Sequence, residues 1–362
     1  MNLLSICDPT RYRHAPLDVP TFYNKLSQDK RVNFYHLPSP AVFEYELSSS
    51  IESAEATVPA IASTGTLAYD DFLTLGARSP TPVSLTDIDL VFCRTLKPFP
   101  KGYLARLAEW EKLTCFVNSP TGKQTQMRLD FLPSIAKDYI PEMIVSDSYA
   151  EAISFFEQHQ TIVVKQDNSC GGRGVFKVWY ESGYFRIDNI LAGSGSFATF
   201  SQVMQFLLRE QAGPLQFCRY LSRTHEGDKR IVVVDGEIYG SYLRRSRSGH
   251  WVNNVSQDGE CSLADISESE RAAIQATVGY YQSLGLHTLG YDFLMDDDGS
   301  WKISEINAGN IGGFARLELL TGEPVMKRFA DWLLEFSKRM HCSKASCQPN
   351  YLRSSLKLAS VA

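Results

Sequence analysis

The sequence predicts an α/β domain at its N-terminus, followed by a longer region of β-hairpins and helices. Residues 2–7 form an apolar run, residues 21–26 have the pattern of a helix, and residues 32–37 form a second apolar run. This strand–helix–strand order is typical of α/β domains with parallel strand pairing. Further along, an Asp-Gly pair at 235–236 and an Asp-rich turn at 296–300 each divide two apolar runs, which predicts two β-hairpins.

Length and composition are those of an ordinary globular protein. The chain has 362 residues, enough for two or three domains, and is 44% hydrophobic and 21% charged. With 36 Lys and Arg against 41 Asp and Glu, its net charge of −5 argues against nucleic acid as the main partner. No apolar run approaches membrane-spanning length, and the first residues lack the pattern of a signal peptide. We therefore expect neither a nucleic-acid nor a membrane partner.

Cysteine usage indicates a reducing compartment. The eight cysteines are scattered without a C-x-x-C pair, and Cys342 and Cys347 are the closest two. No histidine cluster has metal-ligand spacing. This pattern predicts reduced, mostly buried thiols, so we expect a cytoplasmic protein.

The remaining elements follow from apolar runs, helical periodicity and turn residues. In the first part we expect strands at 88–94 and 114–118, a helix at 102–113, and a variable loop region at 45–65. The middle part carries helices at 122–136, 148–159 (with Ser148 as N-cap) and 199–211, strands at 141–145, 161–165, 175–180 and 216–221, and a flexible Gly-Ser loop at 193–196. The last part has helices at 267–284 and 323–340, followed by a tail at 341–362 that we expect to be disordered.

A small-residue loop between two strands is a candidate phosphate site. Lys165 ends one strand, and the loop that follows it contains Gly171 and Gly172 before the next strand begins. Glycines let backbone N–H groups approach phosphate oxygens, and Lys165 would add a positive charge. A plain glycine-rich hairpin turn is an equally good interpretation of this stretch alone. We interpret Cys170, inside the loop, as a small loop residue and not as a nucleophile.

The hairpin around the Asp-Gly pair carries arginines on both strands. With a two-residue loop, Arg230 and Arg245 fall on one face of the hairpin, and Arg247 falls there too. Neighbouring guanidinium groups suit polyphosphate or carboxylate recognition. The alternative is a solvated basic edge that discourages strand pairing, and we favour that alternative for Arg247.

The second hairpin predicts a cluster of oxygen ligands. Because side chains alternate along a strand, Glu305 and Asn307 point to the same face, and Asp292 joins them if the turn has an even number of residues. Two carboxylates and an amide oxygen suit Mg²⁺, which substrate phosphates would complete. The alternative is a solvated hairpin with ordinary surface acids.

Taken together, these motifs resemble those of the ATP-grasp ligases, and bacterial glutathione synthetase in particular. The resemblance rests on Lys165 with Gly171-Gly172, on Gly-Asp-Lys-Arg-Ile-Val-Val-Val-Asp-Gly-Glu at 227–237, and on Asp292 with Glu305-Ile-Asn307. It covers about residues 1–340, including the stretch from Asp87 to Pro120. The chain departs from that family at Gln166, where the family has proline, and in the Ala-Gly-Asn-Ile-Gly-Gly run at 308–313.

The resemblance implies an α/β N-terminal domain followed by an ATP-grasp fold, in which two α+β lobes clasp ATP. The expected parts are an N-terminal domain at 1–120, a central lobe with the glycine loop at 121–200, a C-terminal lobe with the metal site at 201–340, and the tail at 341–362. ATP would be bound by Lys165, Gly171, Gly172, Arg128, Asp228 and the hinge Arg219, Tyr220 and Leu221; Lys123 is an alternative to Arg128. Arg230 and Arg245 would bind phosphate or the activated carboxylate. Asp292, Glu305 and Asn307 would hold Mg²⁺, with Mn²⁺ as an alternative metal.

The activity that the resemblance implies is amide-bond formation driven by ATP. A carboxylate attacks the γ-phosphate to give an acyl phosphate, and an amine then displaces phosphate. γ-Glutamylcysteine and glycine are the default substrates. Two alternatives stay open: a ligase that modifies a peptide, a protein or a natural-product precursor, and a nucleotide-binding regulatory protein without turnover. Partners would be small-molecule or peptide carboxylates and amines; relatives are often homo-oligomers, although no sequence pattern here indicates one.

Overall fold

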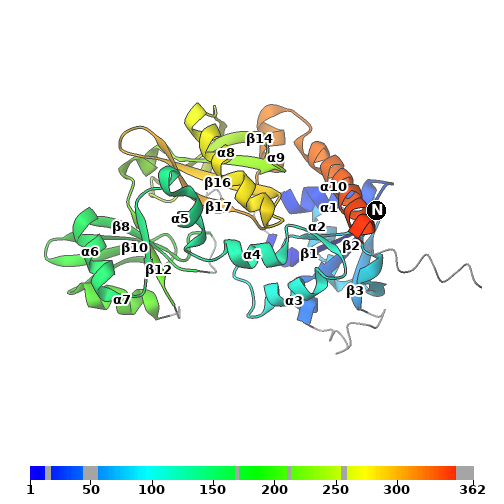
Figure 1. The fold of residues 1–362 in the computed structure, drawn as a ribbon, viewed down its shortest axis with the longest axis horizontal. Helices are drawn as coiled ribbons and strands as arrows, with labels where there is room; N and C mark the ends of the chain where they lie inside the picture. The colour runs from blue at the N-terminus through cyan, green and yellow to red at the C-terminus, as the bar shows by residue number, and fades with distance from the viewer. Residues whose placement is uncertain (13–17, 44–55, 168–170, 210–212, 254–258, 348–362) are drawn as a thin grey trace, which may run out of the picture.

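The computed structural model describes residues 1–12, 18–43, 56–167, 171–209, 213–253 and 259–347. Their strands form three sheets that follow one another along the chain. Figure 1 shows the first and second sheets at opposite ends of the long axis and the third sheet between them. In the described part of the chain, no helix has the length and apolar character needed to span a membrane.

The first sheet has the strand order β4-β3-β2-β1-β5-β6. Its strands are β1 (Asn2–Cys7), β2 (Asn33–Pro38), β3 (Thr57–Ser63), β4 (Thr81–Ser84), β5 (Leu90–Cys93) and β6 (Cys115–Val117). β1 pairs in parallel with β2 and β5, and β5 with β6, which confirms the predicted parallel pairing. β3 and β4 add antiparallel strands at one edge. The expectation of a loop throughout 45–65 is therefore wrong for β3, whereas residues 44–55 lie outside the described part.

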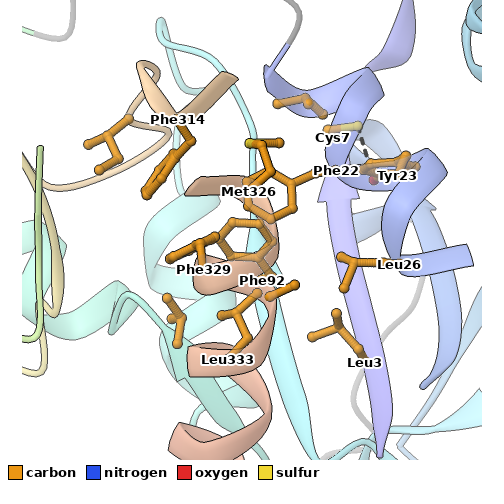
Figure 2. Packing of buried hydrophobic residues seen from close by; sticks show 14 of the residues in the cluster. Leu3, Cys7, Phe22, Tyr23, Leu26, Phe92, Phe314, Met326, Phe329 and Leu333 are labelled. Carbon is orange, nitrogen blue, oxygen red and sulfur yellow. Dashed lines mark hydrogen bonds between the residues drawn. The ribbon is translucent and has the colours of Figure 1, made fainter. Parts of the chain in front are cut away.

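Helices cover both faces of this sheet. The helices involved are α1 (Asp18–Gln28), α3 (Tyr103–Trp110), α9 (Phe314–Thr321) and α10 (Val325–Cys347). α3 packs on one face, while α1, α9 and α10 share a cluster on the other. In that cluster the ring of Phe329 lies 4.9 Å from Phe22, 5.7 Å from Phe92 and 4.3 Å from Phe314 (Figure 2). The last helix of the fold thus completes the core of the first sheet.

The second sheet has the order β11-β10-β9-β8-β12-β7. Its elements are β7 (Met143–Ser146), α6 (Tyr149–His159), β8 (Thr161–Lys165), β9 (Val175–Glu181), β10 (Tyr184–Asn189), β11 (Gly193–Phe197), α7 (Phe200–Leu208) and β12 (Leu215–Arg219). α6 and α7 bury one face, and the alternation of the strands directs Lys165, Lys177 and Gln216 to the other. The Gly-Ser segment that we expected to be a flexible loop instead forms edge strand β11.

The third sheet has the order β15-β14-β13-β16-β17. Its elements are β13 (Asp228–Val234), β14 (Glu237–Ser246), β15 (Gly259–Leu263), α8 (Glu268–Ser283), β16 (Thr288–Met295) and β17 (Trp301–Asn307). Both predicted hairpins are present, namely β13–β14 and β16–β17. Asp235 and Gly236 form the first turn with φ of 53° and 86°, the left-handed values that an Asp-Gly hairpin turn needs.

Several helix predictions need adjustment. Where one helix was expected at 122–136, the chain forms α4 (Pro120–Gln126) and α5 (Phe131–Ala136). Ser148 does cap α6. α10 continues to Cys347, so the expectation of a tail from residue 341 is wrong up to that point, and 348–362 lie outside the described residues. The domain boundaries stay a prediction; β12 belongs to the second sheet although it follows residue 200.

Candidate active site

The β16–β17 hairpin brings Asp292 opposite Glu305 through a β-bulge. Met295 pairs with Trp301 and Phe293 with Ile303, so the turn has an odd number of residues. Continued unchanged, this register would leave Asp292 opposite Ser304. The register shifts at this point and pairs Asp292 with Glu305 instead. The predicted shared face is therefore present, although the even-length turn that we supposed is not.

The Asp292 carboxylate accepts four hydrogen bonds. Oδ1 accepts from Arg230 Nε at 2.5 Å and from Arg244 Nη2 at 2.8 Å, and Oδ2 accepts from Arg230 Nη2 at 2.8 Å and from Asn307 Nδ2 at 3.1 Å. Burial acts to raise the pKa of this carboxyl, but the two guanidinium groups outweigh burial and hold its pKa below the ordinary value. Asp292 is therefore an ionised carboxylate with its acceptor positions filled.

The second arginine at this site is Arg244, and the prediction that Arg245 shares a face with Arg230 is wrong. A bulge between Val232 and Val233 shifts the β13–β14 register by one residue. Arg230 consequently lies opposite Tyr242. Because side chains alternate along a strand, Arg244, two residues after Tyr242, lies on the same face of the sheet as Arg230. Arg245 instead donates from Nε to the carbonyl of Glu226 at 2.8 Å.

Arg244 also binds Asp228, its cross-strand partner. The Arg244 side chain is buried, and that of Asp228 is 15% exposed. Burial raises the pKa of Asp228 to about 6. The positive charge of Arg244 acts to lower this pKa, and the negative charge of Asp292 acts to raise it. Arg247, which we interpreted as a basic edge residue, is exposed and pairs with Glu260 at 3.2 Å.

Two lysines approach Glu305 from other elements. Lys165 Nζ donates to the carbonyl of Ser304 at 2.7 Å. Lys123 lies on α4 and is buried. Burial and the positive charge of Lys97 lower its pKa to about 7, although the negative charge of Glu305 acts to raise it. Glu305 itself is exposed and makes no hydrogen bond or ion pair with any described residue.

Of the two candidates for a second nucleotide-binding cation, only Lys123 lies near Glu305. A Cβ atom added to Gly309, just past Asn307, would lie 3.5 Å from Lys123 Nζ. Arg128 is an exposed side chain that pairs with Asp130 at 2.7 Å. Among the described residues it contacts none of the predicted site residues.

The glycine loop is anchored at its C-terminal end. Gly171 and Gly172 have φ of 66° and 83°, and a Cβ on Gly172 would lie 2.8 Å from the Ile190 side chain. Asn189 Nδ2 donates to the carbonyls of Gly172 at 2.8 Å, Arg173 at 3.0 Å and Val175 at 2.9 Å. Residues 168–170, including Cys170, lie outside the described part of the chain. The visible end of the loop therefore needs glycine at 172 and is held by one amide.

The hinge residues connect the second and third sheets. Arg219 pairs with Asp296 of the β16–β17 turn at 2.7 Å and with Glu142 at 2.9 Å. The Tyr220 ring has Lys177 Nζ 3.9 Å from its centroid, and Leu221 is buried. The strand end and the turn are thus fixed to each other by charge pairs.

The predicted site residues therefore divide into two groups. Those that the structure brings together are Arg230, Asp292, Glu305 and Asn307, with Lys165 beside them. Arg245 and Arg128 lie apart from this group. Sequence reasoning missed Arg244, for which Gly240 inside a strand was the available signal, because glycine there often marks a bulge.

Comparison with known proteins assigns the family. The model of the ATP-grasp domain of prokaryotic glutathione synthetase matches residues 131–322. The chain belongs to this glutathione synthetase ATP-grasp family. The match makes the protein an ATP-dependent ligase. It contains the glycine loop, Arg230, Arg244 and the residues that we predict as hinge and oxygen ligands.

Curated glutathione synthetases match over most of their length. That of Brucella melitensis is 25% identical over 264 residues, which covers 72% of this chain and 77% of the relative. That of Rhodopseudomonas palustris is 26% identical over 265 residues, with the same coverage of 72% and 77%.

Solved structures share the ATP-grasp fold. The D-cycloserine synthetase DcsG superposes with a TM-score of 0.61 at 14% identity, covering 93% of this chain and 100% of that chain. A Chryseobacterium gregarium ATP-grasp ligase, in complex with ADP and a leader and core peptide, gives a TM-score of 0.57 at 18% identity, with 92% and 97% covered. At these identities the likeness shows the fold alone.

Proposed function

We propose that this ligase joins a carboxylate to an amine with ATP and Mg²⁺, through an acyl phosphate. One observation carries the proposal: Asp292, Glu305 and Asn307 share a face with two buried arginines, inside the segment that matches the family. Phosphoryl transfer needs alignment and charge neutralisation and no protein nucleophile. A site of oxygen ligands, arginines and lysines suits that chemistry.

The oxygen donors fit Mg²⁺ with one condition. Among the described residues, no cluster of three or more His, Cys, Asp or Glu offers an alternative metal site. The Glu305 carboxylate and the Asn307 amide oxygen accept no hydrogen bond from those residues. Asp292 accepts four hydrogen bonds and must lose one of them before it can bind the metal. When bound, Mg²⁺ would neutralise phosphate charge and help to orient the γ-phosphate.

The side chains would act by holding and orienting the substrates. Lys165 and Lys123 approach Glu305 from two sides and would bind phosphate oxygens. Arg230, once released from Asp292, would bind the acyl phosphate, while Arg244 stays with Asp228. A carboxylate oxygen bonds to the γ-phosphorus as the bond to ADP breaks; the amine nitrogen then bonds to the carbonyl carbon, phosphate leaves, and the amine loses a proton.

The substrates that we propose first are γ-glutamylcysteine and glycine. The glutathione synthetase relatives support this choice. A peptide carboxylate is the second candidate, because several ligases of similar fold were solved with precursor peptides. The Ala-Gly-Asn-Ile-Gly-Gly run after Asn307 departs from the family and adjoins the site, which favours testing both classes.

ADP release tests the proposal. We would compare γ-glutamylcysteine plus glycine with a panel of other acid and amine pairs, including peptides. Glu305→Gln should abolish release, and Glu260→Gln, the same change at an exposed residue outside the site, should not. ADP release with another acid and amine pair only would support the proposed reaction but contradict the proposed substrates. Absence of release with every pair would contradict the proposal.

A further inference from the structure

Gln126 bridges Lys123 and strand β17. It is the last residue of α4 and is partly buried. Its Oε1 accepts a hydrogen bond from Lys123 Nζ, and its Nε2 donates to the carbonyl of Ile306 at 3.1 Å. Ile306 lies between Glu305 and Asn307, two of the residues that we propose as Mg²⁺ ligands. One side chain therefore connects a candidate nucleotide-binding cation to the candidate metal site.

These two contacts fix the direction in which the Gln126 amide points. An ammonium group can only donate hydrogen bonds, and a backbone carbonyl can only accept them. The amide oxygen must therefore face Lys123, and the amide nitrogen must face Ile306. Neither a carboxylate nor an apolar side chain of the same length could make both contacts.

The helix that carries Lys123 and Gln126 is fixed against the third sheet. A Cβ atom added to Gly122 would lie 1.9 Å from the carbonyl oxygen of Leu284, so the first turn of α4 packs directly on the backbone that follows α8. Residues three apart in a helix share one face. Lys123 and Gln126 therefore lie on the same face of α4, and the bond from Gln126 to Ile306 places that face towards β17.

Lys123 lies where charges from three parts of the fold meet. The charged groups whose fields act on it include Lys97, which follows β5, Glu305 on β17, and Asp167 just before the glycine loop. Burial and the positive charge of Lys97 favour the neutral amine, whereas an acceptor bound to the ammonium favours the charged form. The amide oxygen of Gln126 is such an acceptor.

Both lysines that face Glu305 are held by uncharged acceptors. Lys165 Nζ donates to the carbonyl of Ser304, and Lys123 Nζ donates to the amide of Gln126. A carboxylate partner would neutralise an ammonium and compete with phosphate for it. An uncharged acceptor fixes the position of the ammonium and leaves its charge available to phosphate oxygens.

We propose that Gln126 is a positioning residue for the nucleotide. It holds the Lys123 ammonium towards the phosphates and takes its own support from the Ile306 carbonyl. This inference rests on the proposed function, since it takes Lys123 as a nucleotide-binding residue. Gln126 itself would not touch the reacting atoms, so loss of its amide should weaken nucleotide binding through Lys123 alone.

A double-mutant cycle with Lys123 tests the proposal. Gln126→Met keeps the length of the side chain and removes both contacts. We expect it to raise KM for ATP about fivefold, the size of a lost hydrogen bond, with unchanged KM for the acid and the amine. In a Lys123→Met background the same change should have no further effect on KM for ATP. Gln124→Met, at an exposed residue of α4, should leave all constants unchanged.

A charged replacement tests the role of the uncharged acceptor. In Gln126→Glu the carboxylate would pair with the Lys123 ammonium, add negative charge beside the phosphates and lose the donor for Ile306. KM for ATP should therefore rise more in Gln126→Glu than in Gln126→Met. An equal or smaller rise would contradict the proposal.

Other outcomes overturn the positioning role. Unchanged KM for ATP in Gln126→Met overturns it, and so does a loss that persists in the Lys123→Met background, because Gln126 would then act on β17. Calorimetric titration with a non-hydrolysable ATP analogue and Mg²⁺ gives the same cycle as Kd values. Wild-type binding without turnover would thus contradict the proposed function and still test Gln126, whereas absence of both overturns the two together. If Gln126→Met fails to fold, Gln126→Ala takes its place in the cycle.

Discussion

At the scale of single residues, charge is balanced inside the site before any ligand arrives. Arg230 and Arg244 both pair with Asp292, and Arg244 also pairs with Asp228, so two guanidinium groups face two carboxyl groups. If ATP binds here as we propose, it would bring further negative charge to this cluster. Its phosphates would compete with Asp292 for the guanidinium groups, and the released carboxylate oxygen would then be free for the metal.

Lys123 is expected to bind the nucleotide. Lys123→Met should raise KM for ATP about tenfold or more, because the buried amine beside Glu305 would contact phosphate oxygens. Arg128→Met should leave KM for ATP unchanged, since Arg128 is exposed and pairs with Asp130. ATP saturation curves of ADP release check both variants, and a larger effect of Arg128→Met would reverse the assignment.

His36 should make the protein sensitive to acid. Burial lowers its pKa to about 3, so it stays neutral in the folded protein, whereas the unfolded chain takes up the proton near pH 6.5. The unfolded state therefore binds one more proton between those values, and stability falls as pH drops from 6.5 towards 3. The slope is about 1.4 kcal/mol per pH unit for one proton.

Urea unfolding from pH 6.5 to 4.5 measures this contribution. His36→Gln should show a shallower fall of the unfolding free energy with decreasing pH than wild type. His225→Gln, the same change at an exposed histidine, should follow the wild-type slope. Parallel slopes for wild type and His36→Gln would contradict the assignment.

At the scale of elements, two β-bulges decide which side chains meet. The bulge in β13–β14 turns Arg244 towards Asp292, and the bulge in β16–β17 turns Glu305 to the same face. A bulge adds one residue to one strand, which reverses the facing of every side chain beyond it. The active face is thus a product of two register shifts and not of simple alternation.

Substitution of the two neighbouring arginines checks the first register. Arg244→Met leaves the buried carboxylates of Asp228 and Asp292 without this partner, so it should cost ~3–5 kcal/mol of unfolding free energy. Arg245→Met, one residue on and facing outward, should change stability by no more than about 0.5 kcal/mol. Urea titrations compare the pair, and equal effects would contradict the bulge.

Local chemistry in the sequence accounts for what was predicted correctly. Asp235-Gly236 supplies the left-handed residues that a two-residue turn needs, and Ser148 supplies the hydroxyl that caps a helix. These signals act within a few residues of one another. The family motifs linked residues over a longer range, because Lys165 is distant in the chain from Asp292, Glu305 and Asn307 and lies beside their hairpin in the fold.

What could not be predicted depends on partners distant in sequence. Residues 193–197 have the composition of a linker and become a strand only because β10 offers a row of free backbone groups. The bulges depend on packing between strands, and the sequence indicates one of them only weakly, through Gly240 inside a strand. Gln126 looked like an ordinary polar residue of a helix, because nothing nearby in the sequence reveals that its amide reaches Ile306, 180 residues away.

At the scale of the whole molecule, one hydrophobic cluster joins the first and third sheets. Leu3 and Phe92 come from the first sheet, Val232 and Tyr242 from the third, and Phe329 from α10. Since these side chains share one core, the site loop at 308–313 is held between two sheets that cannot unfold independently at this interface.

Phe329→Ala should weaken the whole interface. The ring is fully buried among Phe22, Phe92 and Phe314, so its removal should cost ~3–5 kcal/mol through lost burial and the cavity left behind. Leu319→Ala, at a side chain that is 74% exposed, is the matched control and should have little effect. Chemical denaturation followed by tryptophan fluorescence distinguishes them, and equal midpoints would contradict the shared core.

The place of α10 against the first sheet has a consequence for biosynthesis. β1 and β5 leave the ribosome early, but the part of their cover that α10 supplies is translated only near residues 326–336. Until then Leu3, Phe22 and Phe92 have no cover from their final partner. Nascent domains usually fold in the order of their synthesis. In this protein the sheet that is made first is completed last, so part of its apolar face lacks its final cover until translation is nearly finished.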